Sequence, residues 1–481
     1  MNKYLYKITA VFFVLISMSS CDEYLDVTPQ DKVLESQTYG TEAGIQNVHN
    51  GLYLQLASNE LYGRQLTMDA IEILGQQYKM DSRHKKNKMA IYAYAETDPK
   101  QIFAGIWEKA YATILNANKF VESIDEHDGV ISTKKANILK GEAIGIRAML
   151  HFDMLRLFGP IYKTNSTSGA IPYYDAPVTA NNPILSAKEV ITKVLADLDA
   201  AILLLSNDPV LTVGRTEDSE EFDNNPYYAN RGLRMNLLAV YCLKARVLLY
   251  SGDTAGASAM ANTVINFTKL NTFFPFTPYL TATDATNPDR TFSSENFFAL
   301  SNTKLYETQK ALFDSNLGDN DIYAPLVARI DAVFENNIND ARNTPSWKIP
   351  QTGGKTIKTF FKYEDVDATK TFRFQVPMFK LSEMYFIAAE TAATPAASVA
   401  LLNTVRPYRG LTALATTLNA GQVTLEIAKE YKKDFIGEGQ LFYYYKRTNT
   451  ASVNNGSTTT TIPMGPLQYV VPLPDSQINF Q

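Results

Sequence analysis

The chain has 481 residues, with 45 Lys and Arg against 50 Asp and Glu and a formal net charge of -5. With 45% apolar residues it can bury a real core, which excludes disorder over the whole chain. The mild acidity argues against a nucleic-acid-binding protein, and two cysteines exclude a disulfide-rich scaffold. At about 150 residues per domain, the length predicts three domains. A helical solenoid can be longer, because it grows by adding repeats.

The first twenty residues have the pattern of a secretory signal. Lys3 and Lys7 precede an apolar run over 8–16, which is too short to span a membrane. Met18-Ser19-Ser20 then leads directly to Cys21, as in a bacterial lipobox. We therefore predict a lipoprotein signal peptide over 1–20 and lipidation of Cys21, which would anchor the protein stably. The alternative is an ordinary signal followed by a chance cysteine. No later segment reaches 18 consecutive apolar residues.

Helical periodicity dominates the first half of the chain. Asp98-Pro99 opens an amphipathic helix to residue 126, and a second helix over 133–158 stops at Gly159-Pro160. These two predict a helical hairpin. A capping box, Ser186 to Glu189, opens a helix to about residue 205. Helices over 231–250 and from about 255 to 267 flank Gly252, in a pattern that resembles one tetratricopeptide unit.

The segment from about 269 to 374 differs, because it holds scattered prolines, scattered aromatics and a Gly-Gly pair. It predicts irregular structure with short helices near 305–315 and 323–337. Helical patterns return over 377–392, 395–406 and 423–446, and the tail carries a β-like piece over 469–471. We predict a mostly α fold, a tetratricopeptide-like helical-hairpin solenoid (about 30–268 and 375–446) with a long loop-rich insertion. Residues 21–481 would form a single domain.

Catalytic and cofactor motifs are absent from the sequence. There is no His-Glu-x-x-His pattern, and Gly353-Gly354-Lys355-Thr356 lacks the earlier glycine of a phosphate loop, because Ile349 stands there. His151 and Cys242 lie on apolar helices and are interpreted as core residues. We predict no catalytic residue, no metal and no cofactor. A carboxylate pair for glycoside hydrolysis stays open, since any two acids can meet in space.

Several segments, in one order along nearly the whole chain, resemble the SusD/RagB family of Bacteroidetes surface lipoproteins. They are Cys21–Pro29, Asn50–Tyr53, Ile106–Asn118, Gly141–Ala148 running on to Arg156–Pro160, Ala245-Arg246 with Tyr250–Asp253, Ala388–Glu390, Leu402–Arg406, Phe435–Gly439 and Pro472–Pro474. Glu142, Arg147 and Arg156 within them are interpreted as buried ion-pair partners, and Trp107 as a core residue. Gln440 and Pro407 depart from the family pattern and place the chain in a divergent branch.

The resemblance implies a lid on a SusC-like TonB-dependent β-barrel transporter in the outer membrane. Such proteins capture glycans at the cell surface without catalysis, and in some branches peptides. It implies a tetratricopeptide scaffold, with the ligand held by the irregular part. Two alternatives stay open: a peptide-capturing lid of the same architecture, and a surface polysaccharide hydrolase.

Loop aromatics outside the helical periodicity are the candidate ligand contacts, because sugars stack on aromatic rings and loops carry recognition. Tyr78 and Arg83 come from the polar stretch before residue 98. Tyr306, Tyr323 and Trp347 come from the insertion. Trp347, flanked by Pro345 and Pro350, is the first choice. Its alternative role is to pin the insertion to the solenoid.

Overall fold

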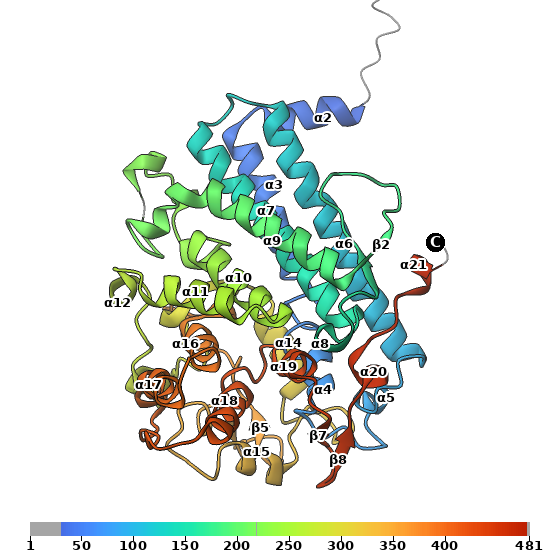
Figure 1. Cartoon of the computed structure of the whole chain (residues 1–481), viewed down its shortest axis with the longest axis vertical. Helices are drawn as coiled ribbons and strands as arrows, with labels where there is room; N and C mark the ends of the chain where they lie inside the picture. Colours follow the sequence, from blue (N-terminus) through green and yellow to red (C-terminus); the bar gives the residue numbers. More distant parts are fainter. Residues whose placement is uncertain (1–29, 218, 479–481) are drawn as a thin grey trace, which may run out of the picture.

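The computed structural model describes residues 30–217 and 219–478, and most of their regular structure is helical (Figure 1). The predicted signal peptide and Cys21 lie outside the described residues. Among the described helices, none combines the length and apolar character that crossing a membrane requires.

The helices vary widely in length, and the longest lie in the first half of the chain. They are α2 (Gln30–Tyr39), α3 (Glu42–Leu56), α4 (Ala70–Leu74), α5 (Asn87–Ala90), α6 (Thr97–Glu126), α7 (Thr133–Phe158), α8 (Tyr162–Asn165), α9 (Ala187–Leu204), α10 (Leu237–Ser251), α11 (Thr254–Ile265), α12 (Leu270–Phe273), α13 (Tyr279–Ala282), α14 (Leu305–Phe313), α15 (Val327–Val333), α16 (Leu381–Glu390), α17 (Pro395–Val405), α18 (Ala420–Asp434), α19 (Leu441–Thr448), α20 (Pro466–Tyr469) and α21 (Asp475–Ile478).

Strands within 30–217 and 219–478 form only short antiparallel pairs. They are β1 (Gly169–Pro172) with β2 (Ile184–Ser186), β3 (Asn296–Ser301) with β6 (Gln375–Lys380), β4 (Trp347–Lys348) with β5 (Thr359–Phe360), and β7 (Ser452–Asn454) with β8 (Thr461–Pro463). The β3–β6 pair joins the first strand of the insertion to the segment that follows it.

Local sequence signals set the ends of the main helices. Ser132 caps α7 by accepting a hydrogen bond from the backbone N–H of Lys135, and Ser186 and Glu189 form the predicted capping box of α9. Gly252 ends α10 in the left-handed region, with φ of 86°. The helical hairpin over 98–158 is confirmed, because α6 and α7 pack against each other.

Successive helices stack in chain order, as a solenoid requires. Each of α6, α7, α9, α10 and α11 packs on the next, and α11 then packs on α16 and α16 on α17 (Figure 1). The insertion separates α11 from α16 in sequence but not in space. The predicted fold class, a mostly α tetratricopeptide-like solenoid with a long irregular insertion, is therefore confirmed.

Three predicted elements are wrong. The helix over 377–392 is the strand β6 followed by α16, because Val376, Pro377 and Phe379 pair with β3. The helix over 423–446 is broken into α18 and α19, since Gly437 and Gly439 adopt φ of 76° and 68°. Of the β-like piece over 469–471, Tyr469 is the last residue of α20, and residues 470–471 belong to no strand.

Helix α7 is the centre of the solenoid, and its residues 141–158 are all buried. Its charged side chains need partners there, because an unpaired buried charge is costly. Glu142 meets Arg231 at 2.5 Å, Arg147 meets Asp197 at 2.5 Å, and Arg156 meets Asp153 at 2.5 Å. The structural roles expected for Glu142, Arg147 and Arg156 are thus confirmed.

The core residues expected from the sequence are also confirmed. His151 is fully buried and stacks on Tyr173 with ring centroids 3.8 Å apart, and burial lowers the pKa of His151 to about 3. Cys242 is fully buried, and burial raises the pKa of its thiol well above the usual value. Trp107 is 5% exposed and packs edge-on against Phe158. A buried, protonated thiol is a poor nucleophile, so Cys242 serves packing.

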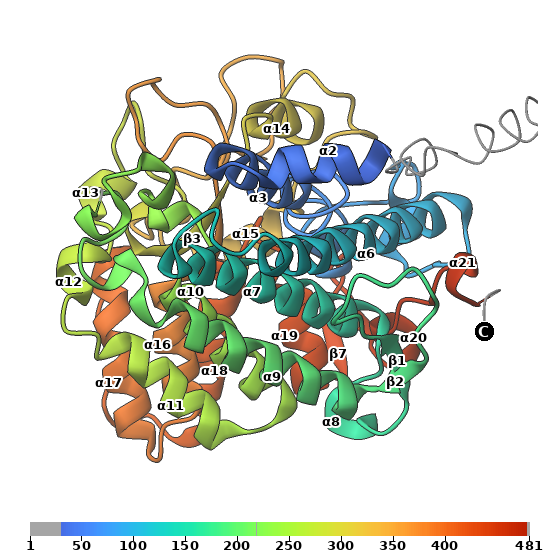
Figure 2. The same cartoon turned by 90° about the horizontal axis from the view of Figure 1, so that it is seen from above.

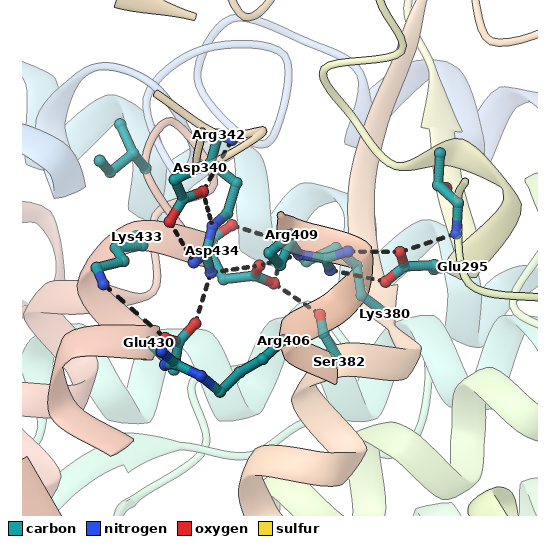
Figure 3. A network of polar contacts seen from close by, with 12 residues as sticks. Glu295, Asp340, Arg342, Lys380, Ser382, Arg406, Arg409, Glu430, Lys433 and Asp434 are labelled. Atoms are coloured by element: carbon teal, nitrogen blue, oxygen red, sulfur yellow. Dashed lines mark hydrogen bonds and ion pairs between the residues drawn. The ribbon is translucent and has the colours of Figure 1, made fainter. Parts of the chain in front are cut away.

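A buried charge network joins the insertion to the last helices (Figure 3). At its centre, Asp434 of α18 has oxygens 3.0 Å from Lys380 Nζ, 3.0 Å from Arg409 Nε and 3.1 Å from an Arg342 nitrogen. Ser382 also donates a hydrogen bond to Asp434, at 2.6 Å. Burial alone would raise the pKa of Asp434, but the three cations hold it well below its usual value. The carboxylate therefore stays ionised inside the protein.

Two of the three cations also pair with acidic residues of the insertion. Arg409 also pairs with Glu295, just before β3, at 2.7 Å, and Arg342 also pairs with Asp340 at 2.8 Å. Figure 2 shows the result: α14 and the loops around it lie on the side of the molecule opposite to α9 and α11. The insertion is thus a separate loop-rich face built on the solenoid.

We predict that Asp434→Asn lowers the free energy of unfolding by about 3–5 kcal/mol, because three buried cations lose their shared carboxylate. Chemical denaturation measures it. Asp199→Asn is the matched control: Asp199 is largely exposed and pairs with Lys244, so its loss should cost about 1 kcal/mol or less. Equal effects of the two substitutions would contradict a stabilising role for the network.

Candidate ligand-binding cleft

A cleft of about 590 Å³ opens within the loop-rich insertion, and we call it the insertion cleft. Its volume lies within the usual range for small-molecule sites, about 300–1,000 Å³. One wall is α14 with the turn after it, and the other is formed by the segments that follow β4 and β5. Its lining residues are Tyr306, Gln309, Lys310, Phe313, Asp314, Ser315, Asn316, Lys348, Ile349, Pro350, Gln351, Thr352, Phe361, Glu364 and Asp365.

Tyr306 places a partly exposed aromatic ring at the α14 wall. The ring packs on Phe374 with centroids 4.7 Å apart, and the Tyr306 hydroxyl accepts a hydrogen bond from the Phe374 N–H at 3.3 Å. The Arg373 guanidinium lies 4.5 Å from the Phe374 ring centroid. These contacts hold the Tyr306 ring in a fixed position while one part of it remains accessible.

The opposite wall contains Phe361, which the sequence analysis did not select. Successive residues of an extended segment point to opposite faces, so Phe360 in β5 turns into the core and Phe361 lines the cleft. Lys348 Nζ lies 4.3 Å from the Phe361 ring centroid. The sequence signal that could have pointed to Phe361 is the doublet Phe360-Phe361, which follows a segment with glycine and proline.

Three of the selected aromatics are buried, so their selection as ligand contacts is wrong. Tyr78 is 1% exposed, Tyr323 0% and Trp347 2%. Tyr78 and Tyr323 have ring centroids 5.4 Å apart, and Trp347 lies 4.5 Å from Phe360. Their loops fold inward because these large apolar rings gain more from burial than from exposure.

The buried rings nevertheless gather beneath the insertion cleft. Phe313, which lines the cleft, contacts Tyr78, Tyr323 and Phe360 with ring centroids 5.7, 6.0 and 5.0 Å away. The Tyr323 hydroxyl donates to Asp69 at 2.8 Å, and that of Tyr78 donates to the carbonyl of Met68 at 3.0 Å. The polar stretch before residue 98 and the insertion thus share one aromatic cluster, which supports the cleft from below.

Arg83 is on the surface, with 75% of its side chain exposed, and lies 3.5 Å from Asp81. It does not line the insertion cleft. A hydrogen bond from Lys355 lowers the pKa of Asp319, and Lys79 and Arg83 contribute to the same shift. The backbone N–H of Lys85, two residues further on, donates to the carbonyl of Asn320 at 3.2 Å, next to the loop over 315–319 that borders the cleft.

Two of the three carboxylates that line the cleft are paired with cations of the protein, whereas Asp314 accepts hydrogen bonds from Asn316. Glu364 lies 2.9 Å from Arg290 and 3.5 Å from Lys348. Asp365 lies 2.9 Å from Arg373, whose hydrogen bond lowers the pKa of Asp365. In the part of the chain that the structure describes, no group of three or more His, Cys, Asp or Glu side chains is placed to hold a metal ion.

Comparisons with known proteins agree on one family. A family model described as "Starch-binding associating with outer membrane" matches residues 23–217. A SusD-like protein of Formosa agariphila is 25% identical over 159 residues, which cover 31% of this chain and 30% of that protein. The chain therefore matches less than a third of the length of this relative.

Solved structures share the fold over almost the whole chain. A SusD superfamily protein of Bacteroides thetaiotaomicron has a TM-score of 0.71 and 19% identity, covering 91% of this chain and 98% of its own. A SusD-like carbohydrate binding protein of Bacteroides vulgatus has a TM-score of 0.69 and 16% identity, covering 92% and 96%. The chain therefore has the same fold as these two proteins. The family-model match adds a likeness to SusD-like proteins over residues 23–217.

Trp347 generates a prediction about stability. Trp347→Ala should lower the free energy of unfolding by about 3–5 kcal/mol, because it leaves a cavity beside Phe360, whereas Trp347→Phe should cost less. Ile349→Ala, at a cleft residue that is 57% exposed, should change it by about 0.5 kcal/mol or less. Thermal or chemical denaturation measures all three, and a Trp347→Ala protein as stable as the parent would contradict the core placement.

Proposed function

We propose that this protein is a cell-surface lipoprotein that captures oligosaccharides in the insertion cleft. It passes them to a SusC-like TonB-dependent outer-membrane transporter, and it does so without catalysis. One observation carries the proposal: a cleft of ligand size in the loop-rich insertion presents a partly exposed, firmly held Tyr306 ring beside amide and hydroxyl groups. The relatives named above, among them a carbohydrate binding protein, support it.

The chemistry of the cleft suits a neutral or weakly charged sugar. An aromatic ring packs on the apolar C–H face of a pyranose, while amides and hydroxyls bond its hydroxyl groups. Tyr306 and Phe361 supply the rings, and Asn316, Gln351 and Thr352 supply the polar groups. Glu364 and Asp365 are already paired with cations, and the two other charges of the lining, Lys310 and Asp314, are of opposite sign, so the cleft has no strong excess of one charge to attract a strongly ionic ligand.

The same pairing argues against a role of Glu364 and Asp365 in glycoside hydrolysis. A glycosidase needs one carboxyl group whose pKa is raised, so that it can donate a proton to the leaving oxygen. Arg373 lowers the pKa of Asp365, and Glu364 lies beside two cations. Asp365 is therefore poorly suited to act as that acid.

Tyr306→Ala should weaken oligosaccharide binding by about tenfold, which corresponds to about 1.4 kcal/mol. The physical reason is the loss of the ring that packs on the sugar. A screen of the purified protein against glycan and peptide libraries identifies the ligand, and isothermal titration calorimetry then measures the affinity.

Tyr408→Ala is the matched control for Tyr306→Ala, because Tyr408 is 38% exposed, stacks on Phe276 and lies outside the cleft. It should leave the affinity unchanged. Unchanged binding by Tyr306→Ala would rule out the insertion cleft as the site. Peptide binding alone in the screen would favour the peptide-capturing alternative, and release of products by the protein alone would favour the hydrolase.

The proposed anchor is tested separately. Cys21→Ala should move the protein from the membrane fraction to the soluble fraction, because the acyl chains attached to Cys21 supply the membrane affinity. Cell fractionation with immunodetection measures it, and Cys242→Ala is the control, since Cys242 is buried in the core. Retention of Cys21→Ala in membranes would contradict lipid anchoring.

A further inference from the structure

A second cleft, of about 780 Å³, lies at the carboxyl end of α3, and we call it the α3 cleft. It is formed by three segments distant in sequence: the end of α3 with the residues after it, the loop before α10, and the end of β3. Its lining residues are Asn50, Tyr53, Leu54, Ala57, Ser58, Asn59, Glu60, Pro226, Tyr227, Ala229, Asn230, Leu233, Arg234, Leu300, Ser301, Asn302, Thr303 and Lys304. It shares none of them with the insertion cleft.

Arg234 is held in this cleft by aromatic rings. The guanidinium carbon lies 4.7 Å from the centroid of the Tyr53 ring and 4.6 Å from that of Tyr227. Both rings are themselves fixed: the Tyr53 hydroxyl donates to Glu142 at 2.5 Å, and the Tyr227 hydroxyl donates to the carbonyl of Gln46 at 3.1 Å. An arginine held against two rings loses little freedom on binding a ligand.

Two buried carboxylates of the solenoid centre are occupied by another arginine, Arg231. Glu142 and Asp208 are buried and pair with Arg231 at 2.5 Å and 2.8 Å. Within residues 30–217 and 219–478, no carboxylate lies within 4.0 Å of the Arg234 guanidinium. Arg147, Arg156 and Arg231 all have such a partner, which makes Arg234 different from the other arginines of the solenoid centre.

The rest of the α3 cleft adds groups that suit a sugar. Amides of Asn50, Asn59 and Asn230 offer donors and acceptors, while Leu54 and Leu300 offer apolar surface. Leu54 is 73% exposed. Lys304 adds a second positive charge and Glu60 a negative one, so the lining is positive overall.

We propose that the α3 cleft binds a carboxylate-bearing sugar, a uronic acid unit, through Arg234. The guanidinium presents a planar pair of N–H groups that matches the two oxygens of a carboxylate, and such pairs are among the stronger hydrogen bonds in proteins. The asparagines bind the sugar hydroxyls, and the apolar side chains cover its C–H face. This second site is independent of the insertion cleft, so either can fail without the other.

The test compares trigalacturonate with its methyl ester, which has the same skeleton without the charges. Isothermal titration calorimetry on the full chain in detergent, at low ionic strength, should show the acid binding at least about tenfold more tightly than the ester. Arg234→Gln should remove that difference, and Arg234→Lys should restore only part of it, because an ammonium cannot form the paired contact. Lys188→Gln, an exposed cation on α9, is the charge-matched control and should change nothing.

Asn59→Asp provides a second variant that leaves Arg234 and its aromatic contacts intact. Asn59 is exposed at the cleft, so a carboxylate there should weaken acid binding by repulsion while the protein stays folded. Tyr306→Ala, in the insertion cleft, should leave trigalacturonate binding unchanged.

Three outcomes would overturn the proposal. They are equal binding of acid and ester, full acid binding by folded Arg234→Gln and by Asn59→Asp, or loss of acid binding with Tyr306→Ala alone. A short peptide with a free carboxyl end that binds more tightly than both trigalacturonate and its own amide would overturn the assignment to a sugar.

Discussion

The arrangement of the loop-rich face depends on Asp434. A buried carboxylate is costly unless cations and hydrogen bonds satisfy it, and here Lys380, Arg409 and Arg342 do so from three segments (Figure 3). Lys380 ends β6, and Arg342 belongs to the insertion. None of these three segments can move away from Asp434 without leaving a buried charge unpaired.

The position of the insertion cleft depends on the same network. Arg409 extends the network to Glu295, which directly precedes β3, and β3 leads into α14 and Tyr306. At the other end, Lys446 of α19 donates hydrogen bonds to the carbonyls of Arg156 and Gly159 at 2.7 Å, and so closes the end of α7. Burial lowers the pKa of Lys446 well below its usual value. Asp434 of α18 thus holds the loop-rich face, and Lys446 of α19 holds the end of the central helix α7.

The sequence predicted the region of the cleft better than its residues. Proline and glycine content indicated the insertion, and Tyr306, one of the residues selected within it, lines the insertion cleft. Tyr78, Tyr323 and Trp347 were selected on the same grounds but are buried. Composition reports that a loop is aromatic, whereas the direction of each ring depends on neighbours such as Phe313 and Phe360 from other segments. Arg234 was not selected, because its lack of a carboxylate partner is visible only in three dimensions.

What the sequence by itself determined is local: the periodic helices, the Ser186 capping box, the stop at Gly252, and the chain segments that resemble a family. These follow from side chains a few residues apart, whose interactions need no distant partner. The tertiary structure alone decided which side chains are buried and which charges pair. Asp434 with Arg342 and Glu142 with Arg231 are each about 90 residues apart, and no local pattern encodes such a contact. The same long-range packing decided that Tyr306 faces a cleft while Trp347 lies beneath it.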